Sequence, residues 1–270
     1  MTVRNGLDAA FDAARREGRG VLIPYLTAGY PELDGFVDLA VTTLEAGADA
    51  LELGVPFSDP VLDGPSIQRS QQRALAAGVT PPVCLQLASQ IHARTGKPLI
   101  SFGAYNPILA YGVERYCRDA SQAGMAGLIA PDVPFEEQGE LRAATAVNLH
   151  LIQLVAPTSS PERLGRVCAA ASGFVYCMSV AGVTGARAGV AATARPLVER
   201  VRACTAIPVA VGFGISTPDH AREVASFADG VVVGSALINL LADTPRERRL
   251  DAVRSFIASL RDALKAAAVS

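Results

Sequence analysis

The chain has 270 residues, of which 50% are hydrophobic and 19% are charged. Lys and Arg number 24 against 26 Asp and Glu, so the formal net charge is −2 and the strongly basic surface of a nucleic-acid-binding protein is excluded. The length fits one α/β barrel domain over residues 1–270, and no apolar run reaches the roughly 18 residues of a membrane span.

The N-terminus and the cysteines both indicate a cytoplasmic protein. Leu7, Ala10, Phe11 and Ala14 follow helical spacing, so the segment predicts an amphipathic surface helix and not a secretory signal. The five cysteines form no Cys-x-x-Cys pair and are odd in number, so we expect free thiols in a reducing compartment.

Eight short aliphatic runs alternate with helical stretches along the chain. Strand–helix alternation predicts a parallel sheet, and eight units in this length predict a (β/α)8 TIM barrel. A doubly wound open sheet, which usually has fewer strands, is the alternative. The predicted strands are Gly20–Leu26, Ala50–Gly54, Pro98–Gly103, Gly127–Ala130, Leu149–Val155, Phe174–Ser179, Pro208–Gly212 and Gly230–Val233.

Helical patterns fill the gaps between these strands. Ser160 before Pro161 and Thr217 before Pro218 each have the form of an N-cap followed by a proline at the first helical position. The predicted helices include Glu32–Ala46, Val113–Ala123, Pro161–Ala171, Pro196–Ala203 and Pro218–Phe227.

Two segments interrupt the alternation. Additional helical sequence is inserted after the second strand, at Ser66–Ala77 and Pro82–Ala93. The segment Val180–Ala194 is rich in Gly, Ala and Thr and has little apolar bulk, so we expect a mobile loop that closes over a site.

Three carboxylates gather at the end of the second predicted strand. Because strand side chains alternate between faces, Glu52 within Ala50–Gly54 is expected to point into the barrel. No Arg or Lys lies in any predicted strand to pair with it, which favours a functional group of raised pKa over a structural carboxylate. Asp59 and Asp63 follow in a shaped turn, and together the three suit general acid–base catalysis.

Glycines at the ends of the last two strands predict a phosphate site. Gly214 ends the seventh strand, and Gly234 with Ser235 ends the eighth. Barrel enzymes often bind phosphate in these two loops through backbone N–H groups and a helix N-terminus. Gly185 could add another close approach of the backbone.

The scarcity of lysine and histidine limits the chemistry. Lys97 and Lys265 lie away from the predicted site, which disfavours Schiff-base and pyridoxal chemistry on this chain. The histidines, His92, His150 and His220, do not cluster, so no metal site is expected. Cofactor-free acid–base chemistry on a phosphorylated substrate remains.

The segment GADALELGVPFSDPVLDGPSIQ closely resembles the signature of the tryptophan synthase alpha chain family. The resemblance continues through PYLTAGYP, YNPILAYG, APDVPFEE, FVYCMSVAGVTGAR, GFGIS and DGVVVGSA, in order over nearly the whole chain. It implies a (β/α)8 barrel and a retro-aldol lyase that cleaves indole-3-glycerol phosphate to indole and glyceraldehyde 3-phosphate, with no cofactor on this chain.

The resemblance also implies a role for each site residue. Glu52 is the principal acid–base group, Asp63 binds the indole N–H, and Asp59 helps to organise the closed site. Tyr176 is a site tyrosine, and Thr184 orders the Asp63 loop when the site closes. The implied phosphate site consists of Gly185, Gly214, Gly234 and Ser235, and the implied indole pocket of Tyr25, Phe102, Ile129 and Val232.

The family pairs with a tryptophan synthase beta chain, so an alpha2-beta2 tetramer is expected, with pyridoxal phosphate on the beta partner. Val180, Ala104 and Tyr25 depart from the residues that many members carry, which affects the expected loop closure, pocket shape and inter-chain signalling. Three alternatives stay open: a standalone indole-3-glycerol phosphate lyase, another phosphate-binding barrel such as a sugar-phosphate isomerase, and a non-catalytic chain that activates a beta subunit.

Overall fold

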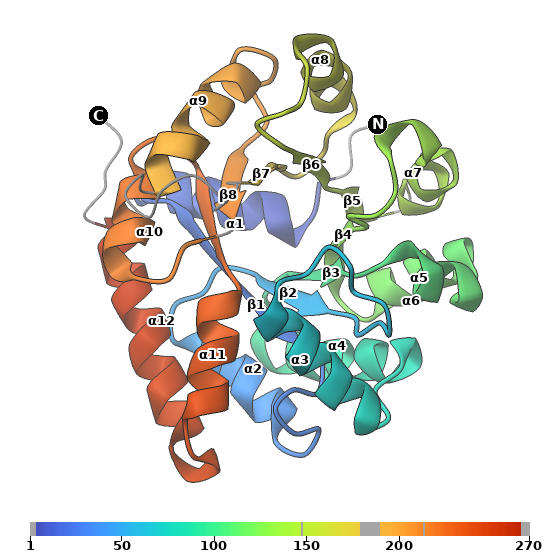
Figure 1. The fold of residues 1–270 in the computed structure, drawn as a ribbon, viewed down its shortest axis with the longest axis vertical. Coiled ribbons are helices and arrows are strands. Elements are labelled where there is room, and N and C mark those ends of the chain that lie inside the picture. The colour runs from blue at the N-terminus through green and yellow to red at the C-terminus, as the bar shows by residue number, and fades with distance from the viewer. Residues whose placement is uncertain (1–3, 147, 179–189, 213, 266–270) are drawn as a thin grey trace.

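The computed structural model describes residues 4–146, 148–178, 190–212 and 214–265, in which a sheet of parallel strands is surrounded by helices (Figure 1). The order of the strands in the sheet is β5-β4-β3-β2-β1-β9-β8-β7-β6. The strands are β1 (Val21–Thr27), β2 (Leu51–Gly54), β3 (Leu99–Phe102), β4 (Met125–Ile129), β5 (His150–Leu151), β6 (Gln153–Val155), β7 (Val175–Met178), β8 (Val209–Gly212) and β9 (Gly230–Val233).

The sheet curls into a nearly closed barrel. Its two terminal strands, β5 and β6, are consecutive in the chain and separated by Ile152 alone, so the ends of the sheet lie next to each other. The predicted fifth strand Leu149–Val155 is therefore present as two short pieces, and the (β/α)8 barrel prediction is confirmed.

Helices connect the strands and cover the outside of the barrel (Figure 1). As predicted, a helix precedes the first strand and two helices follow β2 before the next strand begins. They are α1 (Gly6–Arg16), α2 (Phe36–Glu45), α3 (Pro65–Ala76), α4 (Pro81–Thr95), α5 (Tyr105–Tyr111), α6 (Val113–Gln122), α7 (Gly139–Thr145), α8 (Pro161–Ala170), α9 (Val190–Arg202), α10 (Pro218–Ala225), α11 (Ser235–Asp243) and α12 (Arg249–Lys265), with short 3-10 turns at Phe135–Glu137 and Arg246–Arg248.

None of these helices is by itself long and apolar enough, over its described residues, to cross a membrane. Among the described helices, α3 and α4 taken together, with a bend of 100° between them, are the one pair that satisfies the length and composition of such a span.

The caps read from the sequence are present, whereas one helix begins earlier than predicted. Ser160 and Thr217 each accept a hydrogen bond from a backbone N–H in the first turn of α8 and α10. In contrast, α9 contains Pro196 in its interior, although we predicted a helix starting at this proline. The preceding Ala-rich residues have high helix propensity and extend the helix into the second half of the predicted loop.

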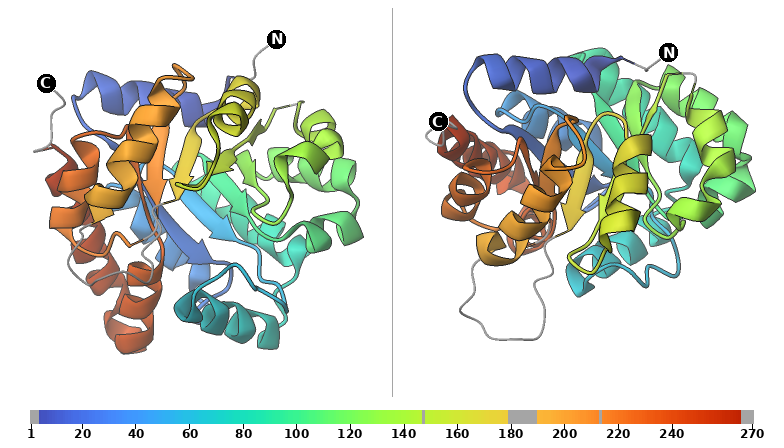
Figure 2. Two further views of the ribbon diagram at one scale, coloured as in Figure 1. Left: turned by 45° about the horizontal axis from the view of Figure 1, so that its top comes forward. Right: turned by 90° about the horizontal axis from the view of Figure 1, so that it is seen from above.

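Two apolar clusters divide the core. The larger cluster lies between the strands and the surrounding helices. The smaller one fills the barrel with side chains such as Ile23, Ile100 and Phe174, and it includes Leu7 and Phe11 of α1. Helix α1 thus closes the N-terminal end of the barrel, while α3 and the loop after β2 lie at the opposite end (Figure 2).

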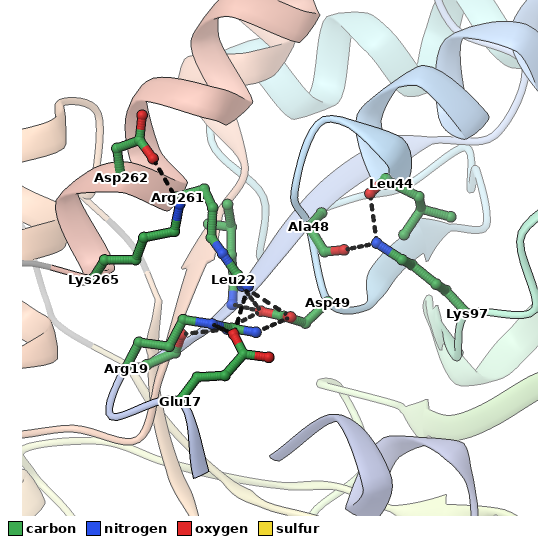
Figure 3. A network of polar contacts seen from close by, with 11 residues as sticks. Glu17, Arg19, Leu22, Leu44, Ala48, Asp49, Lys97, Arg261, Asp262 and Lys265 are labelled. Carbon is green, nitrogen blue, oxygen red and sulfur yellow. Dashed lines mark hydrogen bonds and ion pairs between the residues drawn. The ribbon is translucent and has the colours of Figure 1, made fainter. Parts of the chain in front are cut away.

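A network of charged groups holds the N-terminal end of the barrel together (Figure 3). Both terminal nitrogens of the buried Arg19 side chain donate to the carboxylate of Asp49, at 2.8 and 2.9 Å. The Leu22 N–H and the Arg261 guanidinium of α12 donate to the same carboxylate. Nearby, Lys97 donates from Nζ to the backbone carbonyl oxygens of Leu44 in α2 and of Ala48, which follows that helix. The lysine therefore has a structural role far from the C-terminal end of the strands.

Replacement of Asp49 by Ala is expected to lower the free energy of unfolding by about 3 kcal/mol, because two largely buried guanidinium groups keep only the more exposed Glu17 as a counter-ion. Urea unfolding would measure the loss. Asp262→Ala is the control, since its pair with Lys265 is exposed and should cost less than about 1 kcal/mol. Equal effects of the two substitutions would contradict this account.

Candidate active site

A cavity of about 280 Å³ opens at the C-terminal end of the barrel. It gathers predicted site residues from β1, β2, β3, β7 and β9 and from the loops that follow β2, β8 and β9. The predicted residues that line it are Tyr25, Glu52, Asp63, Phe102, Tyr176, Gly214, Val232, Gly234 and Ser235.

Glu52 is the most deeply buried polar group of this cavity. Its residue surface is 1% exposed, and Oε1 has no hydrogen-bond partner among the described residues. Burial disfavours the charged carboxylate and raises the pKa of Glu52 to about 8. The side chain therefore holds a proton near neutral pH and can also release it, as a general acid and base must.

Two tyrosines pack beside Glu52 because a glycine on the neighbouring strand leaves room for each ring. A Cβ on Gly54 would overlap the Tyr25 hydroxyl, and a Cβ on Gly212 would overlap the Tyr176 hydroxyl. Burial, followed by the charge of Glu52, raises the pKa of Tyr176 well above its usual value. The Tyr176 hydroxyl therefore stays protonated and uncharged over the pH range in which Glu52 titrates.

The Tyr25 hydroxyl is also held by a chain of hydroxyl groups. Thr27 Oγ1 donates to it at 3.3 Å, and Thr27 Oγ1 lies 2.6 Å from Ser70 Oγ of α3. The ring meets Phe102 edge to face, with 5.7 Å between the ring centroids. These contacts fix one wall of an apolar slot that suits a flat aromatic group.

Asp63 faces the same cavity from the loop after β2, whereas Asp59 does not. Asp63 is half-buried, and burial raises the pKa of its carboxyl while a hydrogen bond from Gln71 opposes this rise. Asp59 is exposed and lines a smaller adjoining cavity of about 130 Å³, together with Asp132. Asp132 accepts a hydrogen bond from the Tyr105 N–H and so caps the first turn of α5.

The part of the cavity rim that follows β8 and β9 has a backbone geometry suited to an anion. Gly214 adopts a φ of +78°, and Gly234 is the N-cap residue of α11, whose first residue is Ser235. Backbone N–H groups in the first turn of a helix have no partner within the helix, and the helix dipole favours negative charge there. A phosphate held at this rim would leave the apolar slot and both carboxyl groups for the rest of the substrate.

The structure does not bring every predicted residue into the cavity. Ile129 is fully buried in the apolar cluster inside the barrel and does not line the cavity. Thr184 and Gly185, with most of the predicted loop Val180–Ala194, lie outside the described residues. The described residues contain no group of three or more His, Cys, Asp or Glu side chains placed to hold a metal ion.

Five lining residues were not predicted. Two directly follow a predicted glycine and two lie in the first turns of α11, so proximity in sequence could have indicated them. The fifth, Ile67, comes from the buried face of α3, and nothing in the sequence marks that face as part of the site. They are Ile67, Ile215, Ser216, Ala236 and Asn239.

The fold and these groups define an enzyme of the parallel barrel class, with a buried carboxyl group and a glycine-containing rim at one mouth of the barrel. A sequence profile of the tryptophan synthase alpha chain family matches residues 11–268. The chain therefore belongs to the tryptophan synthase alpha chain family.

Individual relatives agree over almost the full length. The tryptophan synthase alpha chain of Chloroflexus aggregans is 46% identical over 258 residues, covering 95% of this chain and 97% of that protein. That of Gloeobacter violaceus is 48% identical, covering 93% and 91%.

Solved structures give the same assignment. Tryptophan synthase of Mycobacterium tuberculosis superposes with a TM-score of 0.89 at 39% identity, over 98% of this chain and 99% of that chain. The alpha subunit from Legionella pneumophila gives a TM-score of 0.88 at 35% identity, over 97% and 99%.

Replacement of Glu52 by Gln is expected to stabilise the fold in a pH-dependent manner. Below pH 4.5, the ordinary pKa, the carboxyl is protonated in both the folded and the unfolded chain, so it imposes no electrostatic penalty on folding. As the pH rises toward about 8, only the unfolded chain loses this proton readily, so the native protein loses stability that the Gln variant keeps. The gain should reach on the order of a few kcal/mol above pH 8.

Urea unfolding at pH 4.5, 7 and 9 would measure this difference between the two proteins. Glu45→Gln is the control, because Glu45 is exposed at the end of α2. A gain that is the same at all three pH values would contradict the raised pKa of Glu52.

Proposed function

We propose that Glu52 and Asp63 catalyse the retro-aldol cleavage of indole-3-glycerol phosphate to indole and glyceraldehyde 3-phosphate, the reaction of the family to which the chain belongs. The observation that carries this proposal is the buried Glu52 carboxyl, whose Oε1 has no partner among the described residues and whose cavity Asp63 shares. Burying such a group without a partner costs folding free energy. A buried, unpartnered carboxyl group in a cavity therefore indicates a group that protonates or deprotonates a bound ligand.

The slot and the rim orient the substrate between them. The indole ring would lie between Tyr25, Phe102 and Val232, with its N–H toward the Asp63 carboxylate. The phosphate would lie at Gly214 and Ser235, on the part of the rim that follows β8 and β9. Fixing both ends in this way places the reacting carbon beside Glu52.

One carboxyl group can then act twice. Glu52 in its acid form protonates the ring carbon that carries the glycerol chain, and Asp63 stabilises the positive charge that develops at the ring nitrogen. Glu52, now a carboxylate, takes the proton of the glycerol hydroxyl next to the ring. The carbon–carbon bond breaks, its electron pair returns to the ring, and an aldehyde forms. Glu52 ends the cycle protonated, as it began.

This mechanism predicts that kcat/KM depends on pH as a bell. Activity requires ionised Asp63, which sets the acid limb, and protonated Glu52, so the free chain should lose activity above a pKa of about 8. Glu52→Gln should lower kcat by about 100-fold or more, and Asp63→Asn should lower it less. Indole release from indole-3-glycerol phosphate would measure both, and wild-type turnover by Glu52→Gln would overturn the proposal.

We further propose that the chain works with a tryptophan synthase beta chain in an alpha2-beta2 tetramer, with pyridoxal phosphate on the beta partner and none on this chain. Val61 and Leu62 line the smaller cavity and are 83% and 58% exposed. Leu109, 51% exposed, lies in α5, which begins beside that cavity where the Tyr105 N–H donates to Asp132. An exposed apolar patch beside the active-site mouth supports a docking surface for a protein that receives indole. The five free cysteines support a cytoplasmic location.

Docking at this patch predicts how beta-chain activation responds to charge. Val61→Asp and Leu109→Asp should weaken the acceleration of indole release by an added beta chain by about tenfold or more, because each buries an unpaired carboxylate at the interface. Leu250→Asp on α12 is the control, since that exposed leucine lies on another face. Rapid turnover without any beta chain would instead indicate a standalone lyase.

A further inference from the structure

The Gln71 side chain joins the two ends of the loop that carries the predicted site carboxylates. Gln71 lies in α3 and its residue surface is 5% exposed. Its Oε1 accepts the Phe57 N–H at 2.9 Å, and its Nε2 donates to Asp63 Oδ2 at 2.7 Å. Phe57 and Asp63 lie near the start and the end of the connection between β2 and α3.

We propose that Gln71 is a positioning residue for the reaction, because it directs the Asp63 carboxylate into the cavity and selects the ionised form of that carboxylate. This inference rests on the proposed role of Asp63 as the group that receives the indole N–H.

The orientation of the Gln71 amide follows from the groups that it meets. A backbone N–H can only donate, so the amide oxygen must face Phe57 and the NH2 group must face Asp63. The NH2 group offers Asp63 a hydrogen-bond donor and no acceptor at Oδ2. A hydrogen bond to the charged form of a carboxyl group favours that form, so Gln71 works against protonation of Asp63.

No cation shares this task among the described residues that line the two cavities containing Asp63. The titratable groups around it there are Glu52 from β2, Tyr25 from β1, Tyr176 from β7, Asp59 from its own loop and Asp132 after β4. None of them carries a positive charge, and burial raises the pKa of Asp63. The hydrogen bond from Gln71 lowers that pKa, so it keeps the carboxylate available as an acceptor.

A second glutamine on the same helix provides a matched comparison. Gln68 Nε2 donates to the backbone carbonyl oxygens of Asp63 and Pro60, at 2.8 and 3.3 Å. Gln68 therefore orders the same loop without touching a titrating group. The two side chains separate the effect of loop order from the effect on the Asp63 carboxylate.

The test compares Gln71→Met, Gln71→Glu and Gln68→Met with wild type and with Asp63→Asn. The kcat and KM for indole release from indole-3-glycerol phosphate are measured from pH 5 to pH 9 with the full chain, alone and with a beta chain. Gln71→Met should lower kcat/KM at pH 7 by about tenfold or more and move the acid limb of the profile to higher pH. Gln71→Glu, which is close to isosteric, should move that limb further because a carboxylate replaces the donor.

Gln68→Met should leave the acid limb where it is in wild type, whatever it does to the size of the rate. The inference is overturned if both Gln71 variants keep the wild-type limb, or if Gln68→Met moves it equally. Thermal melting checks that each variant is folded. If Gln71→Met does not fold, the acid limb of Gln71→Glu alone tests the inference. Full activity of Asp63→Asn would overturn the proposed role of Asp63 itself, separately from any effect at Gln71.

Discussion

The C-terminal end of this barrel depends on a carboxyl group held among apolar side chains, with no cation beside it among the described residues of its cavity. Packing Glu52 among aliphatic and aromatic side chains shifts its proton affinity into the neutral range. A lysine or arginine in the same place would hold it ionised and remove its acidity. The roles proposed for the aromatic wall, the glycine rim and the Asp63 carboxylate all depend on a group that can exchange a proton with a bound ligand.

The two ends of the barrel use charge in opposite ways. At the N-terminal end, Asp49 meets two guanidinium groups and a backbone N–H, and its charge is fully compensated. At the C-terminal end, Glu52 and Asp63 have no such partner among the described residues of their cavity. The compensated end, closed by α1, gives the scaffold the rigidity that lets the other end keep groups costly to folding.

Features with a short-range cause could be predicted from the sequence. The alternation within Ala50–Gly54 directed Glu52 inward, and Ser160 and Thr217 marked their helix starts, because each depends on a few neighbouring residues. Contacts set by the relative placement of whole elements could not be predicted. Which of two isoleucines reaches the cavity, Ile67 or Ile129, depends on the tilt of the strands and on how α3 lies over the barrel mouth.

The close fit of Tyr25 against Gly54 has a consequence for variation at these two positions. Any side chain at 54 would need the space that the phenol occupies, so a change there is tolerated only alongside a smaller residue at 25. Positions 25 and 54, on adjacent strands, are therefore expected to vary together. Redesign of the slot for a bulkier aromatic ligand must alter Tyr25 and Gly54 together, because the effects of substitutions at the two positions are not independent.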